Sequence, residues 1–203
     1  MTRVYIVRHG QTEWNRQERF RGHIDIPLNE VGLAQSRAIA ADLEKVALAA
    51  VYTSPLGRAV ETARPTAQSH GLELQPLAGI LDINYGQWAG HSTAEVRSAY
   101  PDLLRLWHAE PERVDIPGGE SLKAVRSRAM AAVHEVLARH AGDAILLVSH
   151  QMVGKVLVCT MLGLEVNRIW RIQQDNACIN IFDWDGADFS ALLVNGTAHL
   201  CQA

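Results

Sequence analysis

Apolar residues along the chain alternate between short continuous runs and longer segments in which they recur every three or four positions. The short runs predict buried strands at Arg3–Arg8, Ala49–Ser54, Leu72–Leu77 and Ala144–Ser149. The longer segments predict helices from Asn29 to about Val46, from Pro55 to about His70, and over Glu120–His140 and Gln151–Leu162. In the first of these helices, the residues expected to face the core are Leu33, Ile39, Leu43 and Val46. Because strands alternate with helices, the pattern predicts an α/β protein with a mostly parallel sheet.

Two segments depart from this alternation. Residues from Ile80 to Gly119 contain several Gly and Pro and only short helical stretches, such as Ser92–Tyr100. Near the end of the chain, Ala177–Trp184 and Asp188–Asn195 predict a hairpin that turns at Asp185-Gly186. The length of 203 residues fits one domain, or a core with a small appended lobe.

Composition narrows the classes of function. Hydrophobic residues make up 48% of the chain and charged residues 20%, which excludes a disordered protein. The net charge of -3 argues against a nucleic-acid partner, which needs a basic face. No apolar run is long enough for a transmembrane helix, and the first residues lack the apolar stretch of a signal peptide, so we expect no membrane partner. The three Cys residues form no CxxC, so we expect a reduced, cytoplasmic protein without a thiolate metal site.

Three of the predicted strands end beside residues that can bind or attack a phosphate. Arg8 and His9 close the first strand, Arg58 lies one helical turn beyond the second, and His150 follows the last. In an open parallel sheet, the carboxyl ends of the strands meet at the edge where ligands bind. A single Arg or His at a strand end is commonly structural, but four of them at one edge favour an anion site.

These four side chains suit phosphoryl transfer. Two guanidiniums and a protonated histidine can stabilise a transferring phosphoryl group by charge and hydrogen bonds. His9 can serve as the nucleophile when its ring is neutral, with one nitrogen held by a backbone carbonyl and the other aimed at phosphorus. The chain carries no P-loop, GxSxG, HExxH or dinucleotide-binding fingerprint that would indicate another chemistry.

Six segments occur in a recognisable order: RHGQTEWN at 8–15, GHIDIPLN at 22–29, TSPLGRAVET at 53–62, PGGES at 117–121, VSH at 148–150 and VNGTAHL at 194–200. Together they resemble the signature of the histidine phosphatase superfamily, also called phosphoglycerate mutase-like, over almost the whole chain. The resemblance implies a three-layer α/β/α sandwich with helices on both faces of the sheet. It also implies a single domain over residues 1-203, with a short capping segment at about residues 84-120.

The resemblance assigns roles residue by residue. It implies that His9 is the nucleophile that becomes a phosphohistidine. It implies a pocket for the phosphate formed by Arg8, Arg58, His150 and Asn15. A loop at the edge of the substrate is implied at Arg21, Gly22 and His23. The family uses no metal, so we expect neither a metal ion nor another cofactor.

The proton donor is the one imperfect match. The family carries Glu in a motif like LxEIxFGxWEG, whereas residues 80–90 are ILDINYGQWAG, so Asp82 takes the Glu position. Asp keeps the chemistry but is one methylene shorter, and a general acid must reach the leaving oxygen. We expect Asp82 to be the acid. The alternatives are a vestigial site or a different donor such as Glu13.

Within the family, the sequence favours a phosphatase over a mutase. Members of the mutase branch carry a longer insertion after the acid motif with a paired Arg, whereas Arg97, Arg105 and Arg113 are dispersed here. We therefore expect a metal-independent phosphomonoesterase that acts on a small phosphorylated metabolite. A cofactor-dependent phosphoglycerate mutase and a non-catalytic phospho-ligand-binding relative stay open. A homodimer also stays open, with Trp170 and the C-terminal hairpin as apolar contact candidates.

Overall fold

The computed structural model describes residues 1–202, and its centre is a six-stranded sheet. The strands are β1 (Thr2–Arg8), β2 (Leu48–Thr53), β3 (Leu74–Pro76), β4 (Ala144–Ser149), β5 (Ile179–Trp184) and β6 (Phe189–Gly196). Their order is β3-β2-β4-β1-β5-β6, with β3, β2, β4 and β1 parallel, β5 antiparallel to β1 and β6 antiparallel to β5. The predicted α/β fold with a mostly parallel sheet is therefore confirmed, and the hairpin adds the antiparallel edge.

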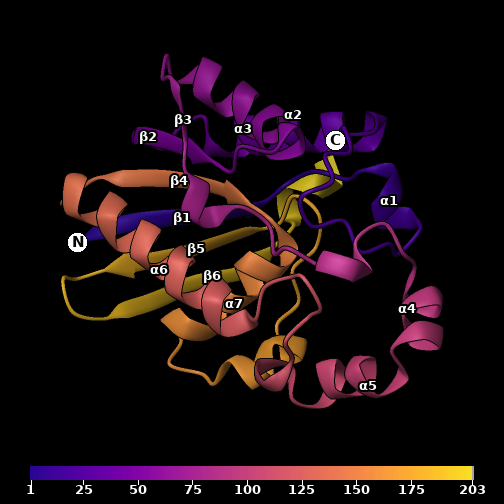
Figure 1. Cartoon of the computed structure of the whole chain (residues 1–203). Coiled ribbons are helices and arrows are strands. Elements are labelled where there is room, and N and C mark those ends of the chain that lie inside the picture. The colour runs from indigo at the N-terminus through magenta and orange to yellow at the C-terminus, as the bar shows by residue number, and fades with distance from the viewer. Residues whose placement is uncertain (203) are drawn as a thin grey trace.

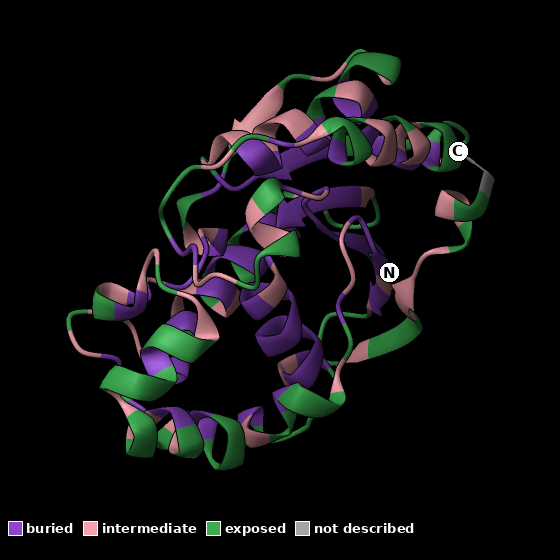
Figure 2. Cartoon of the chain, turned by 90° about the vertical axis from the view of Figure 1, so that its right-hand side faces the viewer, coloured by how far each residue is buried: buried purple, intermediate pink, exposed green. Residues whose placement is uncertain are grey.

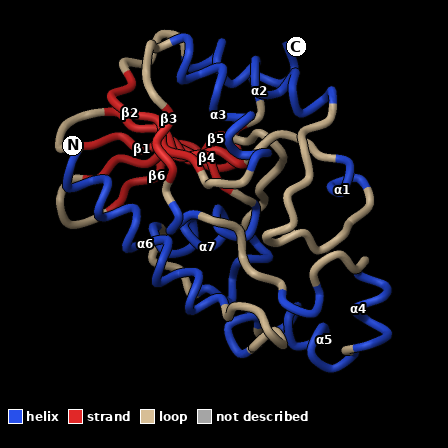
Figure 3. Tube along the Cα trace, turned by 45° about the horizontal axis from the view of Figure 1, so that its top comes forward, coloured by secondary structure: helices blue, strands red, loops and turns tan. Residues whose placement is uncertain are grey.

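Alternate residues of β1 face two separate layers of helices. Val4 and Ile6 pack in one buried cluster with residues of α6 (Leu122–Arg139) and α7 (Gln151–Met161). The intervening side chains Tyr5 and Val7 pack in a second cluster with residues of α2 (Glu30–Leu43) and α3 (Gly57–Ser69). Helix pairs on opposite sides of the sheet form the three layers visible in Figures 1 and 3, as the sequence predicts. Strands β1, β2, β4 and β5 are mostly buried, whereas most of β6 and the outer sides of the helices are exposed (Figure 2).

The buried face of α2 differs from the predicted one. The helix begins after Asn29, whose side chain accepts a hydrogen bond from the Gly32 amide at 2.9 Å. Its buried residues are Gly32, Ser36, Ile39 and Leu43. Leu33 is 41% exposed, so its assignment to the core was wrong. Small residues at 32 and 36 carry the buried face because this part of α2 lies directly against the backbone that follows β1.

Residues beyond β3 form an irregular lobe with two short helices, α4 (Thr93–Ala99) and α5 (Pro101–Ala109), which lie away from the sheet (Figure 1). The sequence predicts α4 but not α5, because Pro101 looks like an interruption. Pro101 instead occupies the first turn of α5, where a missing N–H costs nothing. A four-residue helix, α1 (Glu13–Arg16), also lies outside the predicted elements. No helix in residues 1–202 is long and apolar enough to cross a membrane.

Candidate active site

Three strand ends bring the predicted residues to one edge of the sheet. Strand β4 lies between β2 and β1, so the residues after these strands are neighbours. The His9 amide continues the ladder by donating to the Ser149 carbonyl at 2.9 Å, and the Ser54 amide donates to the Val148 carbonyl at 2.9 Å. The rings of His9 and His150 have centroids 5.3 Å apart. The predicted convergence at the carboxyl edge is present.

The His9 ring is buried and held in one tautomer. Its Nδ1 donates to the carbonyl of Gly10 at 2.7 Å, which leaves the proton-free Nε2 without a hydrogen-bond partner. Burial lowers the pKa of His9 well below its usual value, and His150, Arg58 and Arg8 lower it further. The ring is therefore neutral at physiological pH. A neutral imidazole with one bonded and one free nitrogen has the form that nucleophilic attack requires.

Close backbone contacts fix the loop that carries His9. The Gly10 amide donates to the Thr62 hydroxyl at 2.9 Å, and a Cβ at Gly10 would approach the Gly32 carbonyl oxygen to 2.7 Å. The side-chain amide of Asn176 donates to the carbonyls of His9 and Gly10, each at 3.3 Å. The loop therefore cannot shift without disturbing α2, α3 and the segment before β5.

Arg58 and Arg8 are both buried, and both are anchored by backbone carbonyls. The Arg58 guanidinium donates to the carbonyls of Ile24 at 2.9 Å and Gly22 at 2.8 Å. Arg8 donates through Nη1 to the Gln174 carbonyl at 2.6 Å. The Nε atoms of both side chains are buried without a partner. Buried donors of this kind are costly unless an acceptor meets them, and an anion bound at the site would supply one.

His150 links β2 to the acid residue. Its Nε2 lies 2.7 Å from the Ser54 hydroxyl, and its Nδ1 lies 3.7 Å from Oδ2 of Asp82. Burial lowers the pKa of His150 to about 3 against the opposing pull of the Asp82 carboxylate. His150 is therefore neutral before an anion binds. An anion beside it would favour the protonated form by charge.

Asp82 reaches into the same group of side chains despite its shorter side chain. Its Oδ2 accepts from Arg58 Nη2 at 3.0 Å, and its Oδ1 accepts from the Ile83 amide at 3.0 Å. Burial raises the pKa of this carboxyl, but the guanidiniums of Arg58 and Arg21 and the hydrogen bond from the Ile83 amide together hold it below its usual value. Asp82 is therefore an ionised carboxylate that pairs with Arg58.

One guanidinium forms several of the hydrogen bonds that hold the segment on which Asp82 lies. Arg128, on α6, donates to the carbonyls of Gly79 at 2.8 Å, Leu81 at 2.7 Å and Asp82 at 3.1 Å. It also forms a two-pronged pair with Glu120, at 2.8 and 3.0 Å. This irregular stretch has no ladder of its own, so α6 positions the carboxylate.

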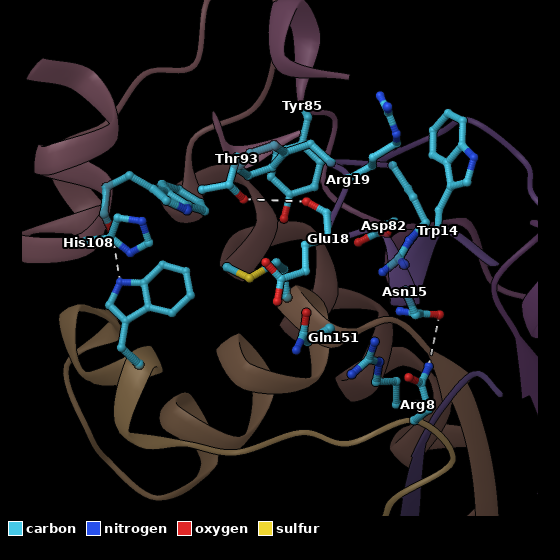
Figure 4. Close-up of a pocket in the computed structure, with 16 residues that line it drawn as sticks. Arg8, Trp14, Asn15, Glu18, Arg19, Asp82, Tyr85, Thr93, His108 and Gln151 are labelled. Carbon is cyan, nitrogen blue, oxygen red and sulfur yellow. Dashed lines mark hydrogen bonds between the residues drawn. The ribbon is translucent and has the colours of Figure 1, made fainter. Parts of the chain in front are cut away.

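A cavity of about 370 Å³ opens over this group. Arg8, Asn15, Arg21 and Asp82 line one end of it, and Figure 4 shows the side chains of Arg8, Asn15 and Asp82 there. The Asn15 carbonyl oxygen accepts from the Thr12 amide at 2.8 Å, so its NH₂ group stays available to a ligand. The other end of the cavity is largely aromatic and is formed by the irregular lobe and residues after α7.

Two of the expected substrate-edge residues lie behind the cavity rather than along it. The Gly22 carbonyl holds Arg58, and His23 Nε2 lies 2.9 Å from the Asp82 carbonyl. Arg21 does line the cavity, with its Nε buried and unpaired. Glu13, the alternative acid, pairs with Arg16 at 3.2 Å on the exposed side of α1.

Sequence reasoning missed several lining residues. Gln151 could have been found, because it directly follows His150 at the start of α7. Trp170 and Asn176 carry no such signal, since they reach the cavity from an irregular stretch far along the chain. Trp170, an apolar contact candidate in the sequence, lines the cavity and donates its Nε1–H to the Trp107 carbonyl at 2.9 Å.

Known proteins resemble this chain in sequence and fold. Phosphoserine phosphatase 1 of Hydrogenobacter thermophilus is 34% identical over 200 residues, which cover 98% of this chain and 95% of that protein. The solved structure of Bacillus stearothermophilus YhfR has a TM-score of 0.94 at 30% identity, over 98% of this chain and 100% of that chain. A phosphoserine phosphatase from Entamoeba histolytica, solved in complex with 3-phosphoglyceric acid, shares the fold with a TM-score of 0.89 at 24% identity, over 98% of this chain and 100% of that chain.

The family found by comparison is the one that the residues at the sheet edge resemble. The family described as the histidine phosphatase superfamily (branch 1) matches residues 4–197. Structures related to this chain thus include one that binds a small phosphorylated ligand. The chain belongs to branch 1 of the histidine phosphatase superfamily.

Proposed function

We propose that the protein is a metal-independent phosphomonoesterase that hydrolyses a small phosphorylated metabolite through a phosphohistidine on His9. The observation that carries the proposal is the neutral, buried His9 ring, with Nδ1 bonded to Gly10 and Nε2 free. A protein that only bound phosphate would need the surrounding cations but no free imidazole lone pair. The free nitrogen therefore favours catalysis over the non-catalytic alternative.

In the first step, Nε2 of His9 attacks phosphorus while the bond from phosphorus to the ester oxygen breaks. The Nδ1–H stays on the Gly10 carbonyl, which stabilises the positive charge that develops on the ring. The guanidiniums of Arg8 and Arg58 meet the phosphoryl oxygens with their unpaired donors. They supply the positive charge that a metal ion provides in other phosphoryl-transfer enzymes.

Asp82 then supplies a proton to the leaving oxygen. In the free site this carboxyl is ionised and paired with Arg58. A phosphate ester carries a charge of about -1.5 to -2 near neutral pH. When it binds, it pairs with the Arg58 guanidinium in place of Asp82, and its negative charge raises the pKa of the Asp82 carboxyl. The Asp82 carboxylate then takes up a proton from solvent when the ester binds, and this proton is the one that passes to the leaving oxygen. In the second step, water attacks the phosphohistidine, the nitrogen–phosphorus bond breaks, and the Asp82 carboxylate takes the proton from water.

The test is hydrolysis of p-nitrophenyl phosphate in the presence of a chelator, together with trapping of the phosphoenzyme in acid and base. We expect turnover and an acid-labile, base-stable phosphoenzyme, both lost in His9→Ala. A panel that includes 3-phosphoglycerate, with its isomerisation followed separately, distinguishes hydrolysis from mutase activity. Labelling retained in His9→Ala would remove His9 as the nucleophile, and no hydrolysis of any ester would overturn the phosphatase.

A further inference from the structure

Arg8 is held by a neutral acceptor. Within residues 1–202, its side chain forms a single hydrogen bond, from Nη1 to the Gln174 carbonyl at 2.6 Å, and it pairs with no carboxylate. Burial and the nearby Arg21 lower the pKa of Arg8 to about 10, so the guanidinium still carries its charge at neutral pH. A carbonyl orients a guanidinium without neutralising it, which leaves the charge for a bound anion. The direction of the Arg8 side chain therefore depends on where the Gln174 carbonyl lies.

The side chain of Gln174 fixes a stretch that has no regular structure. Residues 173–178 belong to no helix or strand. The buried Gln174 amide forms a reciprocal pair with Asn180 on β5: Nε2 donates to Asn180 Oδ1 at 2.7 Å, and Oε1 accepts from Asn180 Nδ2 at 2.9 Å. Gln174 Nε2 also donates to the Gln173 carbonyl at 2.8 Å, and Asn180 Nδ2 donates to the Ile6 carbonyl at 3.0 Å. Every N–H of the two side-chain amides therefore has an acceptor.

Asn180 connects the strand that carries Arg8 to the segment that carries its acceptor. Ile6, whose carbonyl accepts from Asn180, precedes Arg8 on β1 and lies on the strand directly beside Asn180. Asn180 Oδ1 also accepts from the Asn195 amide of β6 at 2.9 Å. A buried network in which every polar group has a partner holds its members rigidly. One fully buried side chain thus fixes both the donor strand and the acceptor segment.

Helix α7 leaves the amide pair no room to move. Gly154 of α7 lies against the Gln174 side chain, and a Cβ at Gly154 would approach Gln174 Oε1 to 2.8 Å. Because the amide is bonded through its oxygen and its nitrogen, it cannot turn aside without losing hydrogen bonds. Helix α7 follows directly after His150, so the pair packs against the helix that begins on the other side of the phosphate site.

Resting on the proposed role of Arg8 as a ligand of the phosphate, we propose that Gln174 and Asn180 are positioning residues, whose paired amides set the Gln174 carbonyl and thereby aim the Arg8 guanidinium at the bound phosphoryl group. Neither side chain lines the cavity, so neither touches the substrate. Neutral amides suit this role, because a buried carboxylate in the network would attract the guanidinium and compete with the phosphate for its charge.

Binding of orthovanadate, a phosphate analogue, measures the aim of Arg8 without requiring turnover. Gln174→Met removes one amide but keeps the length of the side chain and the backbone carbonyl that accepts from Arg8. Asn180→Leu removes the other amide. By isothermal titration calorimetry near neutral pH, we expect each variant to raise the Kd for orthovanadate about five- to twentyfold, because a hydrogen bond weakens steeply when it is misaligned.

A double-mutant cycle separates positioning from a general effect on the fold. If the amides act through Arg8, then Gln174→Met and Asn180→Leu should change the Kd by less than about twofold in a chain that already carries Arg8→Met. A residue that only stabilised the fold would give the same loss of affinity in both backgrounds.

Thr2→Val serves as the control on the same strand. Thr2 is buried at the opposite end of β1, where its hydroxyl donates to the His140 carbonyl and accepts from the Gly142 amide, each at 3.0 Å. The variant should lower the free energy of unfolding, since it leaves buried groups without partners. It should leave the Kd for orthovanadate unchanged.

Gly154→Ala displaces the Gln174 amide without deleting it, and it carries the test if either amide variant fails to fold. We expect it to weaken orthovanadate binding in the same range, about five- to twentyfold, and only when Arg8 is present.

Two results would overturn the positioning role. One is an unchanged Kd in a folded Gln174→Met, Asn180→Leu or Gly154→Ala protein. The other is a loss of affinity that persists undiminished beside Arg8→Met. The phosphatase proposal fails separately: if the unaltered protein hydrolysed no ester, the phosphatase would be refuted, while orthovanadate binding still measured the coupling of the amide pair to Arg8.

Discussion

Arg128 is expected to control catalysis without touching the substrate. Its guanidinium bonds to three carbonyls of the segment that carries Asp82, those of Gly79, Leu81 and Asp82 itself, and to the Glu120 carboxylate. In Arg128→Met these bonds are lost while much of the side-chain stem remains. The segment should then relax, and the Asp82 carboxylate should leave its position beside His150.

The cost can be approximated from these contacts. A hydrogen bond that involves a charged group contributes about 1.5–3 kcal/mol when it is buried. Arg128 and Glu120 are each 24% exposed, so water can replace part of what is lost. We expect the free energy of unfolding to fall by about 2–4 kcal/mol, or the melting temperature by about 5–15 °C for a chain of this size.

The kinetic effect separates positioning from general destabilisation. A general acid contributes about 10²–10⁴-fold, and this contribution matters most for leaving groups that need a proton. We expect Arg128→Met to lower kcat about 10- to 100-fold with an alkyl phosphate such as phosphoserine, but about threefold or less with p-nitrophenyl phosphate. Steady-state assays well below the melting temperature of the variant measure both.

Arg126→Met is the matched control on the same helix. Arg126 is 41% exposed and lies 3.6 Å from Glu112, a surface pair worth about 0–1 kcal/mol. Arg126→Met should lower the free energy of unfolding by no more than that amount. It should leave the dependence of kcat on the leaving group unchanged. If Arg128→Met slowed both substrates by the same factor, the side chain would act through the fold as a whole, and the positioning argument would be wrong.

Two further predictions concern the reacting groups. Asp82→Asn should slow alkyl phosphates at least about tenfold more than p-nitrophenyl phosphate, and an equal loss with both would exclude Asp82 as the acid. Stability should fall in acid because His150 has a pKa of about 3 in the folded chain and about 6.5 when unfolded. The unfolded chain then holds more protons between these pH values, so the free energy of unfolding decreases as pH falls from 6.5. His150 accounts for about 2 kcal/mol of the decrease at pH 5, and His9, whose pKa is also lowered, adds to it. Denaturant unfolding at pH 7 and pH 5 measures this loss, and a His150→Gln variant with the full loss would contradict the assignment to His150.

The chemistry of the site was largely predictable because it lies at strand ends. Arg8, His9 and His150 directly follow or close apolar runs, and parallel strands place their carboxyl ends at one edge whatever the loops do. The role of Asp82 was predicted from the resemblance of the surrounding sequence motif to the family motif, and not from hydrophobic periodicity. The finding that its carboxylate reaches Arg58 at 3.0 Å needed the backbone path of that segment.

Other features depended on contacts between distant segments. Leu33 fits the helical spacing of apolar residues in α2. Gly32, however, contacts the backbone after β1, so that side of the helix faces the core and Leu33 is exposed. Pro101 begins a helix rather than ending one, because its effect depends on whether it stands in the first turn. Neither outcome follows from the local sequence alone.

The amino-acid sequence by itself determined the alternation of strands and helices and the set of groups that meet at the sheet edge, because hydrophobic periodicity and strand direction are local properties. The tertiary structure decided what those groups can do. It bonds Nδ1 of His9 to the Gly10 carbonyl, pairs Asp82 with Arg58 and buries these groups beside His150. Tautomer, ionisation and access depend on burial and on neighbours more than a hundred residues apart, so only packing can set them.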